Sequence, residues 1–340
     1  MNIVFSGNTA DDVWVKAMTH LKSHCHDDQC SRLGNTREVL HASFCVKDPR
    51  QRWVFSRKPA INPAFAIAEV FWILSGKNDA QFVNFWNPLL PKFAGNGTKY
   101  PGAYGYRIRK VFDFDQLSRA YHALKCNPGS RQVVIQIWDP RIDLPSENGT
   151  PQNDDIPCNI CSLLKVREGK LEWLQIMRSN DLYRGTPYNF VQFTTLQEVL
   201  AGWLGLNVGE YFQVSDSLHV YEKEMNEVNV CKSPKRPMNN DDLSTSKERA
   251  DVLIPVVYDA LRKLSFKSLT KKMFHEIITT QGMEGSYFNM LLIAAADSAR
   301  RRGWYQEMQI AKSRCTNKAL AYCWSQWESR RAQRTTATLL

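Results

Sequence analysis

The stretch from Asp155 to Tyr221 constrains the fold of this 340-residue chain more than any other part of the sequence. Two apolar extended segments, Ser162–Val166 and Leu171–Met177, flank the turn-forming residues Arg167-Glu168-Gly169-Lys170, a pattern that predicts a β-hairpin. Upstream, the apolar run Gln132–Trp138 predicts a buried strand. We therefore expect a β-sheet that contains this hairpin.

Helical patterns surround and follow these strands. A helix that ends at Gly205 shows one apolar face, formed by Leu196, Val199, Leu200 and Trp203. Residues Asn207–Val214 can return as a strand. Beyond residue 233 the patterns are helical, at Pro255–Leu264, Ser268–Thr280, Gly285–Arg300 and Tyr305–Arg330. The sequence predicts a mixed α/β (α+β) core over residues 1–232 and a helical extension over residues 233–340.

The amino-terminal part predicts two helices and a strand. Asp11–Leu21 has amphipathic spacing, and Val39–Val46 has the composition of a strand. Pro63 begins an almost wholly apolar helix that ends at Ser75-Gly76. Glu69 is the one charge in that helix, and an isolated buried charge is costly. A structural ion pair and a functional carboxylate are equally open at this point.

The nine cysteines are scattered and odd in number, which favours reduced thiols over a disulfide framework. Cys158 follows Pro157 in a loop between strands, a position that suits a partly exposed nucleophile. Cys161 completes a C-x-x-C spacing, so a redox pair, half a zinc site and a packed cysteine are alternatives. The segment His24–Cys30 resembles a metal cluster, but no second ligand pair follows, which favours a polar loop.

Residues suited to a phosphate and a pyrimidine accompany this cysteine. Arg178 and Ser179 follow a predicted strand, and a guanidinium beside a hydroxyl can bind a phosphate. Arg32 and Arg131 lie in or beside tight loops and could add to the same pocket. The Asn189 carboxamide can present one donor and one acceptor to a pyrimidine edge.

The overall composition is that of a soluble enzyme, with 43% hydrophobic and 23% charged residues. No apolar run approaches the roughly 20 residues that span a bilayer, and the amino terminus lacks a signal-peptide pattern, so we expect a cytoplasmic protein. The net charge of +10 leaves a nucleic-acid-binding protein as an alternative of another class. The basic cluster Arg300–Arg302 has few stacking aromatics beside it, which makes nucleic acid the weaker hypothesis.

The order of these motifs resembles the thymidylate synthase and pyrimidine hydroxymethylase family. The similarity rests on Pro157-Cys158, on Arg178-Ser179-Asn180-Asp181 with Gly185-Thr186-Pro187-Tyr188-Asn189, and on His219-Val220-Tyr221. It extends to Ala68–Gly76 and Tyr104–Arg107, and covers about Gly7 to Asn229. The resemblance implies an enzyme of one-carbon transfer that takes 5,10-methylenetetrahydrofolate as co-substrate and works as a homodimer.

The resemblance also implies a role for each matching position. The catalytic residues would be Cys158, which adds to C6 of the pyrimidine, and Glu69, which manages protons and water. The nucleotide would be bound by Arg32, Arg178, Ser179, Asn189, His219 and Tyr221, with Arg131 supplied by the other subunit. The folate and base side would be lined by Asp181, Trp86 and Tyr104. No metal is expected.

Departures from the family pattern concern the product. Asn159 stands where synthases commonly have histidine, Gln132 replaces a second phosphate arginine, and the carboxyl-terminal third lacks the usual closing tail. Because an open site favours water over hydride transfer, we expect dUMP to be converted to 5-hydroxymethyl-dUMP. Trp86, which resembles a residue that shields the methylene, favours a thymidylate synthase. A flipped Asn189 amide would suit a dCMP hydroxymethylase.

Overall fold

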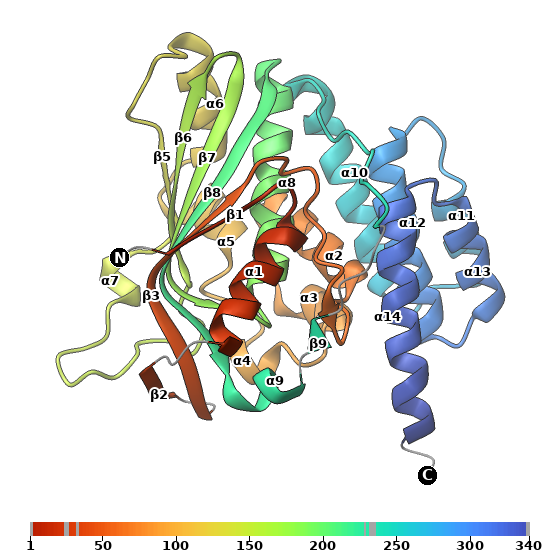
Figure 1. The fold of residues 1–340 in the computed structure, drawn as a ribbon. Coiled ribbons are helices and arrows are strands. Elements are labelled where there is room, and N and C mark those ends of the chain that lie inside the picture. The colour runs from red at the N-terminus through yellow and green to blue at the C-terminus, as the bar shows by residue number, and fades with distance from the viewer. Residues whose placement is uncertain (1–2, 24–26, 32–33, 228, 231–235, 338–340) are drawn as a thin grey trace.

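The sheet forms one side of the molecule (Figure 1). The structure is a computed structural model that describes residues 3–23, 27–31, 34–227, 229–230 and 236–337. Within these residues the main sheet has seven strands, six of them in one path: β1 (Val4–Gly7), β3 (Gly34–Val46), β8 (Asn207–Tyr221), β7 (Lys170–Asp181), β6 (Asn159–Arg167) and β5 (Val134–Gln136). The pairs β1–β3 and β7–β8 are parallel, whereas β3–β8, β7–β6 and β6–β5 are antiparallel. The predicted mixed α/β class is confirmed.

The amino-terminal segment adds a helix and the seventh strand. Helix α1 (Ala10–Ser23) confirms the prediction for Asp11–Leu21 and packs on β1, β3 and the long helix α8 (Thr186–Leu204). Strand β2 (Asp27–Ser31) pairs antiparallel with β3, so the expected polar loop is wrong for these residues. Residues 24–26 lie outside the described residues. The described part of the chain contains no group of three or more candidate metal ligands.

The predicted hairpin is confirmed as β6 and β7. Its turn places Glu168 and Gly169 at φ values of 48° and 71°, in the left-handed region that tight hairpin turns use. Helix α8 follows β7 and stops at Gly205, whose φ of 67° also confirms the sequence prediction. Strand β8 then returns parallel to β7 and runs beyond Val214, to Tyr221. This return brings the carboxyl-terminal ends of β7 and β8 together.

The predicted buried strand at Gln132–Trp138 is wrong in its length and in its burial. Only Val134–Gln136 form β5, which is the edge strand of the sheet and pairs with β6. Val134 is 47% exposed, whereas Ile135 is buried. An apolar run does not distinguish a central strand from an edge strand, since the position in the sheet decides which side chains are covered.

Helix α2 (Pro63–Leu74) forms the centre of the helical layers. Asn62 caps it by accepting a hydrogen bond from Phe65 N at 3.2 Å, and Pro63 occupies the first turn, as predicted. Helix α8 packs on α2 from the side of the sheet. An apolar helix of this kind requires cover all round.

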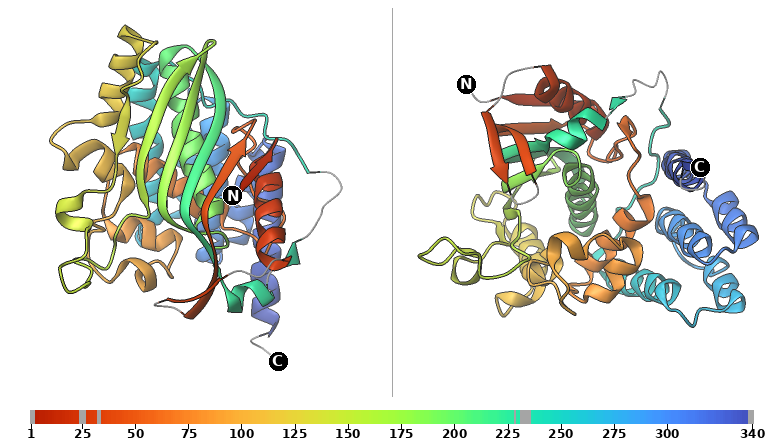
Figure 2. Two further views of the ribbon diagram at one scale, coloured as in Figure 1. Left: turned by 60° about the vertical axis from the view of Figure 1, so that its left-hand side comes forward. Right: turned by 90° about the horizontal axis from the view of Figure 1, so that it is seen from below.

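The carboxyl-terminal helices supply the rest of that cover. They are α10 (Lys247–Ser265), α11 (Lys271–Ile278), α12 (Gly285–Arg301), α13 (Tyr305–Arg314) and α14 (Lys318–Ala337). Helices α10, α12 and α14 contact α2, and Figure 2 shows the group beyond α2 on the side away from the sheet. A single helix over Tyr305–Arg330 is a wrong prediction, because Asn317 caps a new helix by accepting from Leu320 N at 3.0 Å.

Shorter elements complete the fold. No helix in the described residues is long and apolar enough to cross a membrane. The elements are α3 (Ala80–Trp86), α4 (Pro91–Ala94), α5 (Tyr104–Tyr106), the π-helical turn η1 (Arg107–Val111), α6 (Gln116–Cys126), α7 (Pro140–Asp143), α9 (Glu222–Glu227), β4 (Arg57–Lys58) and β9 (Asn229–Val230).

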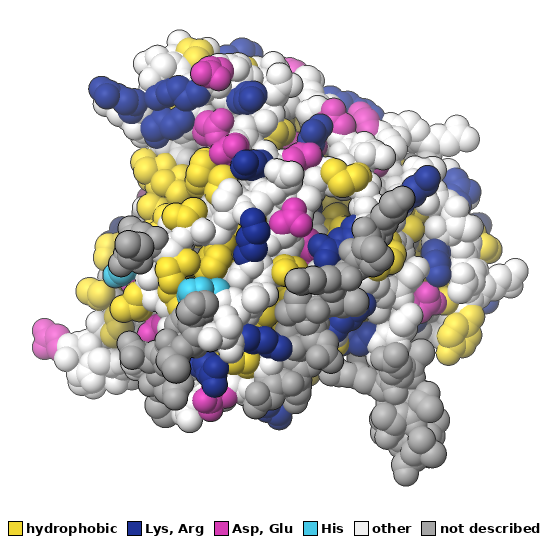
Figure 3. Space-filling view, in the orientation of Figure 1, with side chains coloured by type: hydrophobic (Ala, Val, Ile, Leu, Met, Phe, Trp, Pro, Cys, Tyr) yellow, Lys and Arg dark blue, Asp and Glu magenta, His cyan; other side chains and the backbone are white. Residues whose placement is uncertain are grey.

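Among the described residues, Figure 2 shows no helix over the second face of the main sheet. The residues of β7 and β8 that alternate with the buried Trp173 and Tyr211 point to this outer face and include both apolar and charged side chains. Figure 3 shows hydrophobic side chains gathered over this side of the molecule. The apolar residues of this face that are half-buried or exposed include Leu163, Leu174, Ile176, Phe212 and Val214, and the charged residues Glu172 and Glu210 lie among them.

Candidate active site

Cys158 lies in the loop immediately before β6, and Arg178 of β7 holds that loop in place. The Arg178 backbone N donates to Cys158 O at 2.9 Å, and its guanidinium donates to Pro157 O at 2.9 Å and Ile156 O at 3.1 Å. Burial raises the pKa of the half-buried Cys158 thiol, while the positive charge of Arg178 acts in the opposite direction. Arg178 therefore combines a structural role with an electrostatic one that favours the thiolate.

The residues expected to bind phosphate are not all in one place. Ser179 follows Arg178 on β7, opposite Ser217 of β8, so these two candidates adjoin the cysteine loop. Arg131 is exposed in the loop before β5. Arg32 lies outside the described residues. The structure thus brings Arg178 and Ser179 beside Cys158, and leaves Arg131 on the surface.

Asp181, His219 and Tyr221 meet where β7 and β8 end. Asp181 is the register partner of His219, and its Oδ1 accepts from the backbone N of Tyr183 at 2.9 Å and of Arg184 at 2.8 Å. Burial raises the pKa of Asp181, against these hydrogen bonds and the nearby His219 and Arg184. The rings of His219 and Tyr221 are 5.8 Å apart. Parallel pairing of β7 with β8 therefore joins two motifs that are distant in the sequence.

Glu69 and Asn189 are connected by a third residue, Gln192. Gln192 Nε2 donates to Glu69 Oε2 at 2.6 Å, and Asn189 Nδ2 donates to Gln192 Oε1 at 3.1 Å. Gln192 is 3% exposed. Burial raises the pKa of the Glu69 carboxyl to about 7, although the Gln192 hydrogen bond acts to lower it. Since Glu69 has an amide partner and a pKa near neutrality, it suits proton transfer better than a structural ion pair.

Tyr104 lies where the cysteine loop meets the Glu69 group. Burial holds the pKa of its phenol well above the ordinary value, and negative charge on Cys158, Glu69 or Asp155 raises it further. Asn159 is fully buried next to it, and its interaction with the Tyr104 phenol acts to lower that pKa. A buried amide has both a donor and an acceptor to satisfy, and Tyr104 can satisfy one of them, which makes Asn159 a candidate for binding a ligand or a water molecule.

Asp155 adds a second carboxylate near Cys158. Its Oδ2 accepts from Gly102 N at 2.8 Å, and burial raises its pKa to about 6. A side chain at Gly102 would collide with Asp155, which explains the glycine. Among the described residues, the charges that act on the Cys158 thiol are those of Arg178, Asp155 and Asp181, and burial raises the pKa values of both carboxyls.

Trp86 is fully buried at the junction with the carboxyl-terminal helices. Its carbonyl accepts from Asn62 Nδ2 at 3.0 Å and from Arg301 Nη2 at 2.7 Å, and its ring packs on Phe85 at 4.9 Å between centroids. Asn62 N also donates to the hydroxyl of Tyr188, the residue before Asn189, at 3.0 Å. Trp86 is thus linked to α8 through Asn62.

Two alternatives raised by the sequence concern the C-x-x-C pair and the basic cluster. Cys158 and Cys161 are both free thiols, and the described residues bring no third candidate metal ligand to them. Arg300 and Arg301 pair with the buried Asp297, and Arg302 donates to Ser298 and to the backbone carbonyl of Phe266, so this basic cluster is engaged within the protein. The arrangement does not favour a nucleic-acid surface.

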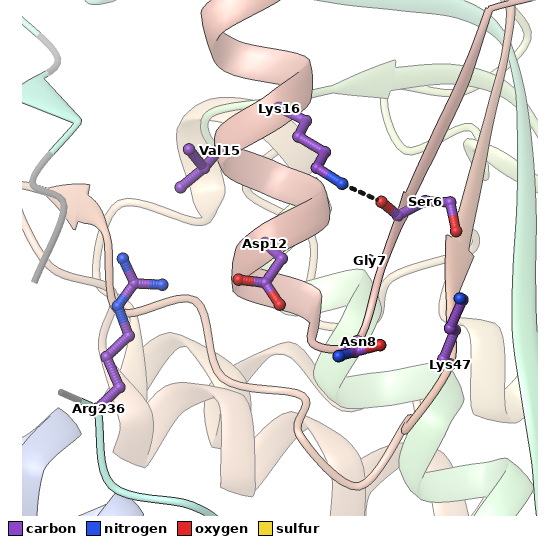
Figure 4. A pocket seen from close by; sticks show the side chains of 8 residues that line it. All are labelled: Ser6, Gly7, Asn8, Asp12, Val15, Lys16, Lys47 and Arg236. Carbon is purple, nitrogen blue, oxygen red and sulfur yellow. Dashed lines mark hydrogen bonds between the residues drawn. The ribbon is translucent and has the colours of Figure 1, made fainter. Parts of the chain in front are cut away.

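A cavity of about 490 Å³ lies where β1 ends and α1 begins (Figure 4). Lys16 crosses part of it by donating to Ser6 O at 2.5 Å. The other lining residues are Gly7, Asn8, Asp12, Val15, Lys47 and Arg236. None of the site residues predicted from the sequence lines this cavity, so the candidate active site is defined by the contacts around Cys158 and Glu69.

Comparison with known proteins agrees with this arrangement. A family model described as thymidylate synthase matches residues 44–258, which include Cys158, Glu69 and Asn189. The chain belongs to the thymidylate synthase family. The match ends within α10, so it covers the sheet from late β3 onward together with the helices that position the candidate site.

Three relatives illustrate the similarity. The deoxyuridylate hydroxymethyltransferase of Bacillus phage SP01 is 38% identical over 196 residues, which cover 54% of this chain and 50% of that protein. The protein of the same description from Pseudomonas phage M6 is 35% identical over 182 residues, 53% and 50% of the two chains. A putative thymidylate synthase of Methanothermobacter marburgensis is 30% identical over 220 residues, 63% and 92% of the chains. The chain spans about half the length of the two phage relatives.

The structure adds Gln192 and Asp155 to the residues considered from the sequence. Gln192 lies within a buried stretch of α8, where a glutamine among apolar residues was the available signal, because a buried amide needs partners. Asp155 ends a polar loop, and nothing in its local sequence distinguishes it from the neighbouring Asp154.

Proposed function

We propose that this chain transfers a one-carbon unit from 5,10-methylenetetrahydrofolate to C5 of dUMP and releases 5-hydroxymethyl-dUMP. The proposal rests on three groups. They are the Cys158 thiol beside Arg178, the Glu69 carboxyl with its pKa of about 7, and the Asn189 amide, which Gln192 connects to Glu69. A nucleophile, a proton carrier and a base-reading group are the parts that such a reaction needs.

In this proposal Cys158 begins the reaction. Its thiolate adds to C6 of the pyrimidine. The electron pair of the C5–C6 double bond then moves to C5 and is shared with the neighbouring C4 carbonyl. C5 then attacks the folate methylene, so that a C–C bond forms and a C–N bond of the folate breaks. Glu69 directs removal of the C5 proton through ordered water, and tetrahydrofolate leaves behind an exocyclic methylene at C5.

Water completes the proposed reaction. It adds to the exocyclic methylene, the electrons return through C5, and the bond from C6 to Cys158 breaks to restore the thiolate. In a thymidylate synthase, hydride from tetrahydrofolate would take the place of this water. The buried amide of Asn159, which interacts with Tyr104 and keeps further hydrogen-bonding capacity, is suited to hold a polar molecule at this position. The higher identity to proteins described as deoxyuridylate hydroxymethyltransferases supports the same product.

Substrate binding is assigned, as part of the proposal, from the positions around Cys158. The phosphate is held by Arg178, Ser179 and Arg32, the sugar 3′-hydroxyl by His219 and Tyr221, and the base by Asn189. The folate is held on the side of Asp181, Trp86 and Tyr104. The carboxylate of Asp181 offers acceptors and the half-buried ring of Tyr104 offers a stacking face, which fit a pterin with its N–H groups.

A second copy of the chain completes the proposed site. The outer face of the sheet carries Leu163, Leu174, Ile176, Phe212 and Val214, and no helix of the described residues covers it, so in a two-fold dimer it would be covered by the same face of the partner. Arg131 is exposed at the edge of this sheet, so in this proposal it reaches the phosphate of the other subunit. The division into a core of residues 1–232 and an extension of residues 233–340 also remains a proposal.

The test is an assay of the purified protein with dUMP, dCMP or CMP and methylenetetrahydrofolate. We expect dUMP to gain CH₂O by mass, with tetrahydrofolate as the second product. A gain of CH₂ with stoichiometric dihydrofolate would make the chain a thymidylate synthase. Turnover of dCMP in preference to dUMP would make it a dCMP hydroxymethylase. Absence of turnover with all three nucleotides would contradict one-carbon transfer.

A further inference from the structure

Among the described residues, Gln192 alone forms hydrogen bonds to both the Glu69 carboxyl and the Asn189 amide. It lies one helical turn after Asn189 on α8, and Glu69 faces it from α2. Both ends of its amide are used: the nitrogen donates to Glu69 at 2.6 Å, and the oxygen accepts from Asn189 at 3.1 Å. At 3% exposure, bulk water cannot replace either partner.

The direction of these hydrogen bonds follows from the carboxylate. An ionised Glu69 offers acceptors and no donor, so the Gln192 atom that faces it is the amide nitrogen. The Gln192 oxygen then faces Asn189, and it accepts a hydrogen bond from the Asn189 amide nitrogen. No group in the described part of the chain donates to Asn189 Oδ1, so this oxygen is the acceptor that Asn189 offers to a ligand.

We propose that Gln192 is a positioning residue that determines base specificity, because it holds Asn189 with its oxygen presented to a pyrimidine N3–H. This inference rests on the proposed function, in which Asn189 reads the base. Uracil has a hydrogen on N3 and an acceptor at O4. Cytosine has a bare N3 and an amino group at C4, so it requires the opposite orientation of the asparagine amide.

Reversing the Asn189 amide is costly in this arrangement. Rotation of Asn189 alone sets its oxygen against the Gln192 oxygen at a hydrogen-bond distance. Rotation of Gln192 as well sets an amide oxygen against the Glu69 carboxylate, which above its pKa of about 7 has no proton to donate. Either change leaves two acceptors facing each other in a buried site, so the charge of Glu69 is transmitted to the base through two amides.

The test compares dissociation constants for dUMP and dCMP by calorimetry in three variants. Gln192→Met keeps the length of the side chain and removes both hydrogen bonds, so we expect the preference for dUMP to fall roughly 10-fold or more. Gln192→Glu shares a proton with Glu69 and still presents an acceptor to Asn189, so it should keep the preference. Gln197→Met is the matched control: the buried Gln197 of the same helix donates to Leu171 O and Gly209 O, away from Glu69.

The outcomes separate the inference from the proposed function. Circular dichroism and thermal unfolding first establish that each variant is folded. A folded Gln192→Met protein with the wild-type ratio of dissociation constants would overturn the inference, as would a wild-type protein that binds dCMP more tightly than dUMP. A ratio that falls equally in Gln197→Met would also overturn it, since the effect would then be a general consequence of loosening α8. A wild-type protein that binds neither nucleotide would contradict the proposed function itself.

Discussion

The two halves of the candidate site are held together in different ways. The strand half consists of Cys158, Arg178, Ser179, Asp181 and His219, which backbone hydrogen bonds of β6, β7 and β8 place side by side. The helix half consists of Glu69, Asn189 and Gln192, which buried side-chain hydrogen bonds connect between α2 and α8.

This difference predicts different responses to substitution. A backbone ladder is retained when one side chain is shortened, so changes in the strand half should remove chemistry and leave the architecture intact. In the helix half each amide is oriented by its neighbour, so a single substitution should alter both the orientation of the remaining amides and the pKa of Glu69. The variants below test whether the contrast holds, beginning with the largest expected effect.

Replacement of Cys158 by alanine should abolish turnover while the nucleotide still binds. The loop is held by its backbone and by Arg178, so removal of the sulfur deletes the nucleophile without moving the site. We expect kcat to fall roughly 10⁴-fold or more, as when a catalytic nucleophile is lost. Steady-state kinetics and calorimetry with dUMP provide the measurement.

Cys161→Ala is the matched control for this prediction. Cys161 lies on β6 and points to the outer face of the sheet, and burial raises the pKa of its thiol without a compensating cation. The variant should retain nearly full activity. If both variants lost activity to a similar degree, a redox or metal role of the C-x-x-C pair would replace the nucleophile assignment.

Arg131 tests whether the strand half extends across a dimer. In the proposed dimer, Arg131→Ala alone should raise the dUMP KM, because one cation at the phosphate is lost. Mixed subunits of Cys158→Ala and Arg131→Ala should recover part of the wild-type activity, since one site of each hybrid retains both groups. A monomer in analytical ultracentrifugation at assay concentration, or no recovery on mixing, would count against the shared site.

Glu69→Gln tests the helix half through the pH dependence of stability. Burial raises the Glu69 pKa from 4.5 to about 7, so the folded wild-type protein binds this proton more tightly than the unfolded chain does. The corresponding stability is complete below about pH 4.5 and is lost as pH rises to about 7. The variant lacks this loss, so its free energy of unfolding relative to wild type should increase by about 3 kcal/mol between these limits.

Urea unfolding of both proteins at about pH 4.5 and about pH 8 measures this difference. Groups such as Asp155 titrate in both proteins and cancel in the comparison. If the free energy of unfolding changed equally with pH in wild type and variant, ionisation of Glu69 would cost no stability. The helix half could then not be treated as one buried unit.

Local signals explain what could be predicted from the sequence. The hairpin, α8 and its stop at Gly205 follow from turn residues and periodicity within short windows, and the structure has all three. The hairpin and the helix depend on neighbours in the sequence. The strand half was predicted from the order of its motifs, which resembles a family pattern, because its residues are brought together by the pairing of β7 with β8.

Features that depend on distant neighbours could not be predicted in the same way. Gln192 contacts Glu69 across a separation of 123 residues, and its importance appears once α2 and α8 are packed together. The exposed edge of β5 depends on the position of this strand at the end of the sheet, where no strand of the described residues pairs with its outer side. The break before α14 depends on Asn317, whose side chain also reaches Asn239 at a separation of 78 residues.

The smallest expected effect concerns the link between the helix half and the carboxyl-terminal helices. Arg301 of α12 donates to Trp86 O and pairs with the buried Asp297, which Arg300 also contacts. Arg301→Ala therefore leaves Asp297 with a partner and Trp86 O with its bond from Asn62, so the cost should be about 1 kcal/mol in the free energy of unfolding. Because Trp86 is assigned to the folate side, the KM for methylenetetrahydrofolate should also rise a few-fold. Arg300→Ala is the control: it removes one ion pair of Asp297 without touching Trp86, so it should lower stability to a similar degree and leave this KM unchanged. Equal KM values in the two variants would show that α12 supports the fold without acting on the site through Trp86.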